Sequence, residues 1–106
     1  MTAERFPRVT RPFEVRDILA DAGAELREVS LPLTGALGRV TSEAVYQIGQ
    51  AIYGRNAYSP NLVRSGTRTA LALVLKARKM EGAPDRLGTV ATLLQTALRN
   101  TPRRSP

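Results

Sequence analysis

The sequence predicts an all-α fold, a compact bundle of about four helices, and three observations support this. Apolar side chains recur at the three- and four-residue spacing of amphipathic helices over most of the 106 residues. Pro, Gly, Ser and Thr stand at the ends of these stretches, where helix caps and turns need them. The connections are short, as between antiparallel neighbours in a bundle. We expect one domain over residues 1–106, with an N-terminal arm at 1–11 and a flexible basic tail at 100–106.

The first helix is expected over residues 12–29. Its core face carries six apolar residues: Val15, Ile18, Leu19, Ala22, Leu26 and Val29. A stripe of carboxylates runs beside that face: Glu14, Asp17, Asp21, Glu25 and Glu28. Such a stripe is typical of a face that docks on a basic surface, and equally of an ordinary solvated face. Asp17, Asp21 and Glu25 are therefore candidate subunit-interface residues.

Residues 30–41 are expected to form an irregular connection, because Pro32, Gly35 and Gly38 disfavour a helix there. The second helix then covers residues 42–54, with Thr41 or Ser42 as its cap and Gly54 at its end. Its core stripe is Val45, Ile48 and Ile52. Gly49 would allow another helix to approach closely.

The central helix, residues 60–81, has the clearest start and end. Ser59 suits the N-cap and Pro60 the first helical position, while Gly82 can close the helix in the left-handed conformation. Its predicted core face is wide: Leu62, Val63, Gly66, Ala70, Leu73, Val74, Ala77 and Met80.

The opposite face of the central helix is basic, with Arg64, Arg68, Lys76 and Lys79, and with Arg78 at its edge. Leu71 and Leu75 lie among these bases. Two leucines there indicate contact with another protomer, or else burial against the first helix or the 30–41 connection. We name both leucines as candidate interface residues. A last helix over residues 84–99 completes the bundle, with Leu93 off its core stripe.

Composition excludes several kinds of chemistry. The chain has no Cys and no His, which excludes disulfides, thiol catalysis, His- or Cys-based zinc sites and histidine-assisted nucleophiles. Asp17 and Asp21 have the i, i+4 spacing of paired acids or metal ligands, but no cleft residue stands near them, and no phosphate-binding Gly-rich loop occurs. No apolar run spans a membrane or resembles a signal peptide. We expect a cytoplasmic protein that is not an enzyme and holds neither a metal nor a cofactor.

The net charge of +7 is unevenly distributed. Residues 1–11 carry +2, residues 12–43 carry −3 and residues 44–106 carry +8. A basic C-terminal part of this kind indicates a polyanion partner, most commonly nucleic acid. Aromatic residues are few, which favours phosphate contact over base stacking. The candidate nucleic-acid-binding residues are Arg55, Arg64, Arg68, Lys76, Arg78 and Lys79, and the candidate stacking residue is Tyr58.

The segment from Tyr58 to Lys76, YSPNLVRSGTRTALALVLK, resembles the central motif of the small-subunit family of class 1 CRISPR effector complexes. The motif has a Tyr shortly before a Pro, then an aliphatic pair and a base, a Gly, and an Ala/Leu-rich helix that ends in Lys. The similarity is closest to type III small subunits, is compatible with a type IV assembly, and covers residues 44–80. Family members usually have an aromatic residue where Leu73 and Val74 stand here.

This resemblance implies a non-catalytic all-α subunit of a multisubunit, RNA-guided ribonucleoprotein complex. Several copies would stack head to tail beside the other effector subunits and contact the backbone of guide RNA and target nucleic acid. Among the basic residues, only Arg64 and Lys76 match the motif, whereas Arg68 and Lys79 follow from the helical face. The acidic first helix and the two leucines would then supply contacts between protomers.

Two other interpretations remain open at the level of sequence. Helices 42–53 and 60–80 could form the reader pair of a helix-turn-helix DNA-binding regulator. Against it, the second of these helices is long, and its basic face lacks the Asn or Gln that reads adenine. The chain could also be a small helical adaptor or inhibitor that binds through its acidic helix.

Overall fold

The computed structural model describes residues 12–54 and 59–101, with side chains from Val15 onward in the first helix. This part of the chain forms four α-helices: α1 (Pro12–Ser30), α2 (Gly35–Tyr53), α3 (Pro60–Arg78) and α4 (Leu87–Asn100). No strand occurs within it. The predicted all-α bundle of about four helices is therefore confirmed.

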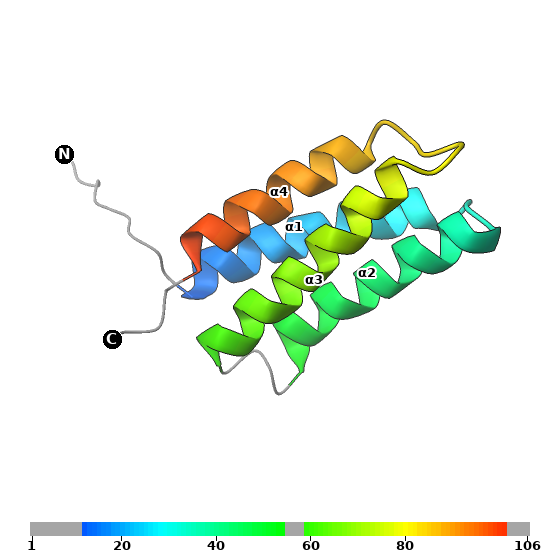
Figure 1. Cartoon of the computed structure of the whole chain (residues 1–106). Helices are drawn as coiled ribbons and strands as arrows, with labels where there is room; N and C mark the ends of the chain where they lie inside the picture. The colour runs from blue at the N-terminus through cyan, green and yellow to red at the C-terminus, as the bar shows by residue number, and fades with distance from the viewer. Residues whose placement is uncertain (1–11, 55–58, 102–106) are drawn as a thin grey trace.

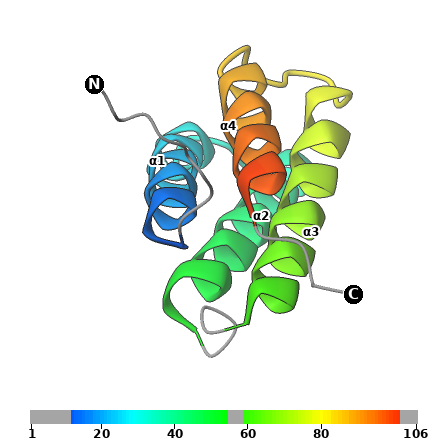
Figure 2. The same ribbon diagram turned by 90° about the vertical axis from the view of Figure 1, so that its left-hand side faces the viewer.

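The helices run up, down, up and down, and each packs against two neighbours in the ring α1–α2–α3–α4 (Figures 1 and 2). As a consequence, α1 begins and α4 ends at the same end of the bundle (Figure 1). The acidic α1 and the basic α3 lie diagonally across the ring, so the charged stripes of these two helices face away from each other.

The core is filled mainly by leucine, isoleucine and valine from α1, α2 and α4. The largest fully buried apolar side chains are Leu19, Leu26, Ile48, Leu87 and Leu94. Helix α3 contributes smaller groups: Gly66, Thr67, Ala70, Val74 and Ala77. A Cβ placed on Gly66 would lie 3.6 Å from the Cβ of Ala51, so α3 can pack closely on α2.

The start of α2 differs from the sequence prediction, which placed a connection over residues 30–41. The connection is only residues 31–34, and Gly35 and Gly38 both lie inside the helix. Gly38 is buried, and a Cβ there would lie 2.8 Å from the carbonyl oxygen of Leu33. This glycine is therefore required by the close approach of the connection to the helix.

The predicted caps at Thr41 and Ser42 are consequently wrong. Thr41 is fully buried within α2, where its Oγ1 lies 2.8 Å from the Oγ of Ser30 and donates to the carbonyl of Leu37. Thr34 occupies the N-cap position, without a side-chain capping bond. Gly54 follows the last residue of α2 as predicted, but its backbone is extended.

The beginning of α3 is as predicted, because the Oγ of Ser59 accepts from the backbone N–H of Leu62 at 3.4 Å and Pro60 is the first helical residue. The helix ends at Arg78, three residues before the predicted position, through two tight turns at Lys79 and Met80. Gly82 does take a positive φ of 83°, but in the connection beyond the helix.

Helix α4 begins at Leu87, after a turn over residues 84–86, and extends to Asn100. Thr101 is buried and bonded to the carbonyl of Ala97, so the predicted flexible tail at 100–106 begins too early. The arm at 1–11, Arg55, Tyr58 and residues 102–106 lie outside the described residues.

Candidate nucleic-acid interface

The basic residues predicted from the sequence lie mainly on the outer face of α3. The side chains of Arg68, Lys76, Arg78 and Lys79 are exposed there. Arg68 and Lys79 are separated by eleven residues, or about 16 Å along a helix at 1.5 Å per residue. This length matches about five nucleotides of one strand in a helical duplex.

Helix α4, which packs beside α3, adds a further exposed base, Arg99 in its last turn. Neither α3 nor α4 contains an Asp or a Glu. Among the side chains of residues 15–54 and 59–101, no carboxylate lies within salt-bridge distance of Arg68, Lys76, Arg78, Lys79 or Arg99. We call these five side chains the basic face. Its charges are available to an external anion.

Arg64 has a structural contact that its sequence position did not indicate. Its Nη2 donates to the carbonyl of Thr101 at 2.6 Å, just beyond the end of α4. A cationic donor at that place satisfies an open carbonyl and suits the negative end of the helix dipole. A guanidinium has five N–H donors, so the half-buried Arg64 keeps donors for a phosphate at the margin of the basic face.

Two other arginines also secure helix ends. The Nη2 of Arg16 donates to the carbonyl of Ile52 at 2.7 Å, in the last turn of α2. Arg86 precedes α4 and contacts two carboxylates of α1: Glu25 through Nε at 2.6 Å and Glu28 through Nη2 at 3.1 Å. These two arginines therefore stabilise the fold.

These contacts change the interpretation of the acidic stripe on α1. The hydrogen bond from Arg86 lowers the pKa of Glu25. The hydrogen bonds to Glu25 and Glu28 in turn raise the pKa of Arg86. Glu25 was named as an interface residue, yet its charge is already matched within the chain. Asp17 and Asp21 are exposed and have no cationic partner among the described residues.

The two leucines named as interface residues differ from each other. Leu71 is half-buried and packs against the core, as does Leu93 on α4. Leu75 is 37% exposed beside the bases of α3. Leu62, predicted to be in the core, is exposed instead.

The described residues contain no group of three or more Asp or Glu side chains that could hold a metal ion. Over the same residues, no helix is both long enough and apolar enough to cross a bilayer.

In comparisons with known proteins, no protein-family model, curated protein or solved structure matches the chain significantly.

Proposed function

We propose that this protein is a non-catalytic small subunit of a class 1 CRISPR ribonucleoprotein complex in the cytoplasm, which binds guide RNA and target nucleic acid by their backbones. One observation carries the proposal: the five exposed cations of the basic face have no carboxylate partner among the described residues. Such a surface suits phosphates whatever the base sequence.

The kind of side chain on this surface also supports backbone contact. Exposed aromatic rings would be needed for base stacking. The exposed tyrosines of the described chain, Tyr46 and Tyr53, both lie on α2, away from the basic face. A subunit that follows a guide-paired strand needs phosphate contacts without base readout.

The asymmetry of charge across the bundle is compatible with stacking of several copies. Asp17 and Asp21 of one copy could face bases of the next, in the heterologous contact that builds an open row of subunits. Arg86 already pairs with Glu25, so Asp17 and Asp21 are the acids that such a contact would use.

The arrangement of α2 and α3 does not favour the helix-turn-helix alternative. In that motif the two helices cross at about 90–120°. Here they lie side by side and antiparallel (Figures 1 and 2).

The proposal is tested by reversing charges on the basic face. The double variant Arg68→Glu/Lys79→Glu should weaken binding to a guide–target duplex and to single-stranded RNA at least tenfold, with an unchanged melting temperature. Arg27→Glu is the matched control for the single variant Arg68→Glu, because it makes the same charge change at an exposed position on α1, across the bundle from α3. Fluorescence anisotropy at several salt concentrations measures both affinity and its salt slope. Each lost phosphate contact should reduce that slope by about 0.7–0.9.

Equal weakening by Arg27→Glu and by Arg68→Glu would contradict a localised site. Affinity purification from the native host tests the assembly itself. Recovery of a large complex with guide RNA and several copies of this chain supports the proposal, whereas a free dimer on one duplex promoter contradicts it.

A further inference from the structure

A groove lies between α1 and α2, on the side of the bundle away from the basic face. It consists of two hollows, of about 240 Å³ and about 250 Å³, which share Arg27 and Val45 as lining residues. Its lining follows α2 from Ser42 to Tyr53. Eleven residues of helix measure about 16 Å, or three turns.

Small side chains make the groove, mainly Ala20, Gly23 and Ala24 on α1 and Gly49 on α2. A Cβ placed on Gly49 would meet nothing within 4 Å, so no other described helix of the bundle packs closely on this glycine. The space over Gly49 is open.

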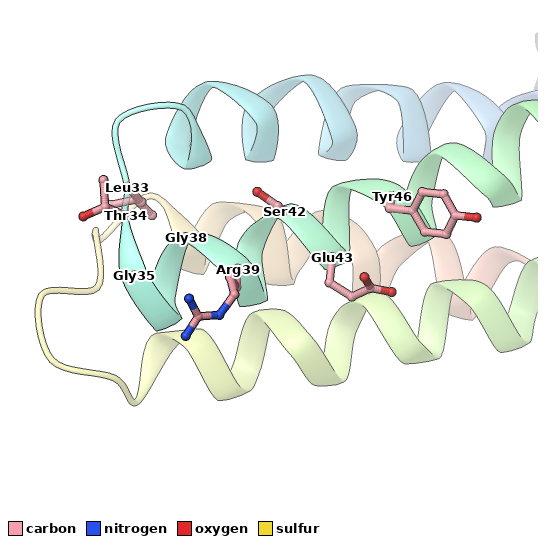
Figure 3. A pocket seen from close by; sticks show the side chains of 8 residues that line it. All are labelled: Leu33, Thr34, Gly35, Gly38, Arg39, Ser42, Glu43 and Tyr46. Atoms are coloured by element: carbon pink, nitrogen blue, oxygen red, sulfur yellow. The ribbon is translucent and has the colours of Figure 1, made fainter.

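Exposed apolar groups gather around this groove. Among the described residues, the exposed large apolar side chains are Leu31 (77% exposed), Tyr46 (58%), Tyr53 (81%), Leu62 and Leu75. Leu31 and Tyr53 line the two hollows. Tyr46 lines a shallow depression that shares Leu33 and Ser42 with the hollow at Leu31 (Figure 3). In that view Ser42 points toward α1, whereas Arg39 and Glu43 lie on the side of α3.

On the α1 edge of the groove, the exposed Arg27 lines both hollows, and carboxylates lie outside it. Ala24 lines the groove, and Asp21 and Glu28 are its surface neighbours, three residues before and four after. Glu28 is paired with Arg86, whereas Asp17 and Asp21 have no cation among the described residues. An occupant would gain most from positive charge along this edge.

We propose that this groove binds an amphipathic helix of a partner protein, with an apolar stripe in the groove and Lys or Arg along the edge over α1. A helix fits because the lining of the groove follows α2 for about three turns, and helix-in-groove recognition uses apolar anchors at i, i+3, i+4 and i+7. A strand would find no sheet edge to pair with in the described chain.

A second copy of this chain does not supply such a helix from its described residues. Each of the four helices already has its apolar stripe in its own core. On α3, the exposed leucines Leu62 and Leu75 are thirteen residues apart and lie on different sides of the helix. The occupant is therefore another protein, and the proposal is independent of nucleic-acid binding at α3.

The test uses the full chain, labelled with ¹⁵N, and a synthetic helical peptide of about four turns with Leu at i, i+3, i+4 and i+7 and Lys elsewhere. A matched peptide has Glu in place of each Lys. The Lys peptide should shift the backbone amides of Gly23 and Gly49, which line the groove, and leave that of Gly88 on α4 unchanged. The Glu peptide should bind at least tenfold more weakly.

Two variants make the result specific. Gly49→Leu fills the groove and should weaken the Lys peptide at least tenfold. Its melting temperature should not fall, because Leu favours helix over Gly and the added Cβ has open space. Ala72→Leu is the control, because it adds the same side chain on the exposed face of α3.

The proposal is overturned if neither peptide binds, if both bind equally, or if binding survives Gly49→Leu. It is also overturned if the shifts appear at Gly88, or if a single-stranded oligonucleotide, rather than the Lys peptide, shifts Gly23 and Gly49. Charge reversal at Arg68 and Lys79 should leave peptide binding unchanged, which separates this proposal from the one for the basic face.

Discussion

The α1–α2 pair and the α3–α4 pair have similar helical structure but opposite charge. Residues 12–54 contain six carboxylates and three arginines, a formal charge of −3, whereas residues 59–101 contain seven bases and two carboxylates, a formal charge of +5. Because consecutive helices are neighbours in the ring, this separation along the chain becomes a separation in space (Figure 2). The net charge of +7 therefore describes neither side of the molecule.

The two pairs also differ in what they expose. The α1–α2 side has an apolar groove with tyrosines and a leucine around it, while the α3–α4 side has isolated bases among threonines, small residues and two separate leucines, Leu62 and Leu75. The first surface suits a protein helix and the second a phosphate backbone. One small bundle thus presents two surfaces of different chemistry.

The largest expected effect tests whether the two pairs are separate folding units. Leu26 on α1 and Leu94 on α4 are both fully buried in one core. Leu26→Ala and Leu94→Ala should each lower the free energy of unfolding by about 3 kcal/mol, from lost burial and the cavity left behind. Urea denaturation should show one cooperative transition in both variants. Loss of helicity in two steps would contradict a shared core. Leu75→Ala is the control, because it shortens a leucine at an exposed position.

An intermediate effect is expected from two buried threonines, one in each pair. Thr41 bonds to the Oγ of Ser30 on a neighbouring helix, whereas Thr67 bonds only within its own helix, to the carbonyl of Val63. Thr41→Val should cost about 1–2 kcal/mol because it removes a buried partner of Ser30. Thr67→Val should change the stability much less. Chemical denaturation measures the free energy of unfolding of both variants. Equal losses would show that the Thr41–Ser30 hydrogen bond between helices contributes no more than a bond within one helix.

The smallest effect concerns the ion pairs that join the two halves at Arg86. The folded-state pKa of Glu25 is lowered by the hydrogen bond from Arg86, so this contact contributes stability above the unfolded pKa of about 4.3. The contribution is lost as the pH falls through the folded-state pKa. Arg86→Gln should therefore lower the melting temperature slightly at pH 7 and by a smaller amount at pH 3. A difference in melting temperature that grew on acidification would contradict this assignment.

The sequence predicted three helices well because their signals are local. Caps such as Ser59 with Pro60, and the regular apolar stripes of α1 and α4, depend on residues a few positions apart. The start of α2 was missed because Gly35 and Gly38 act there through a tertiary contact with the connection at Leu33. The spacing of Gly38, Thr41, Ala44 and Ile48 was the available signal, and all four are buried.

For the candidate sites, too, the sequence predicted local features and missed tertiary contacts. Helical periodicity predicted that Arg68, Lys76, Arg78 and Lys79 lie outside the core, and all four side chains are exposed. It could not show that Arg64 contacts Thr101, or that Arg86 pairs with Glu25, because these partners are 37 and 61 residues apart in the sequence. The groove between α1 and α2 was missed for a related reason, since it arises only when two helices are placed side by side.

The placement of negative charge on one side of the bundle and positive charge on the other gives the molecule an electric dipole across its helices. The field of any polyanion exerts a torque on this dipole, which turns α3 and α4 toward the negative charge before contact. Orientation of this kind acts on the rate of encounter more than on the lifetime of the complex, and added salt weakens it. The same rotation would leave the α1–α2 groove facing solvent, open to a second partner.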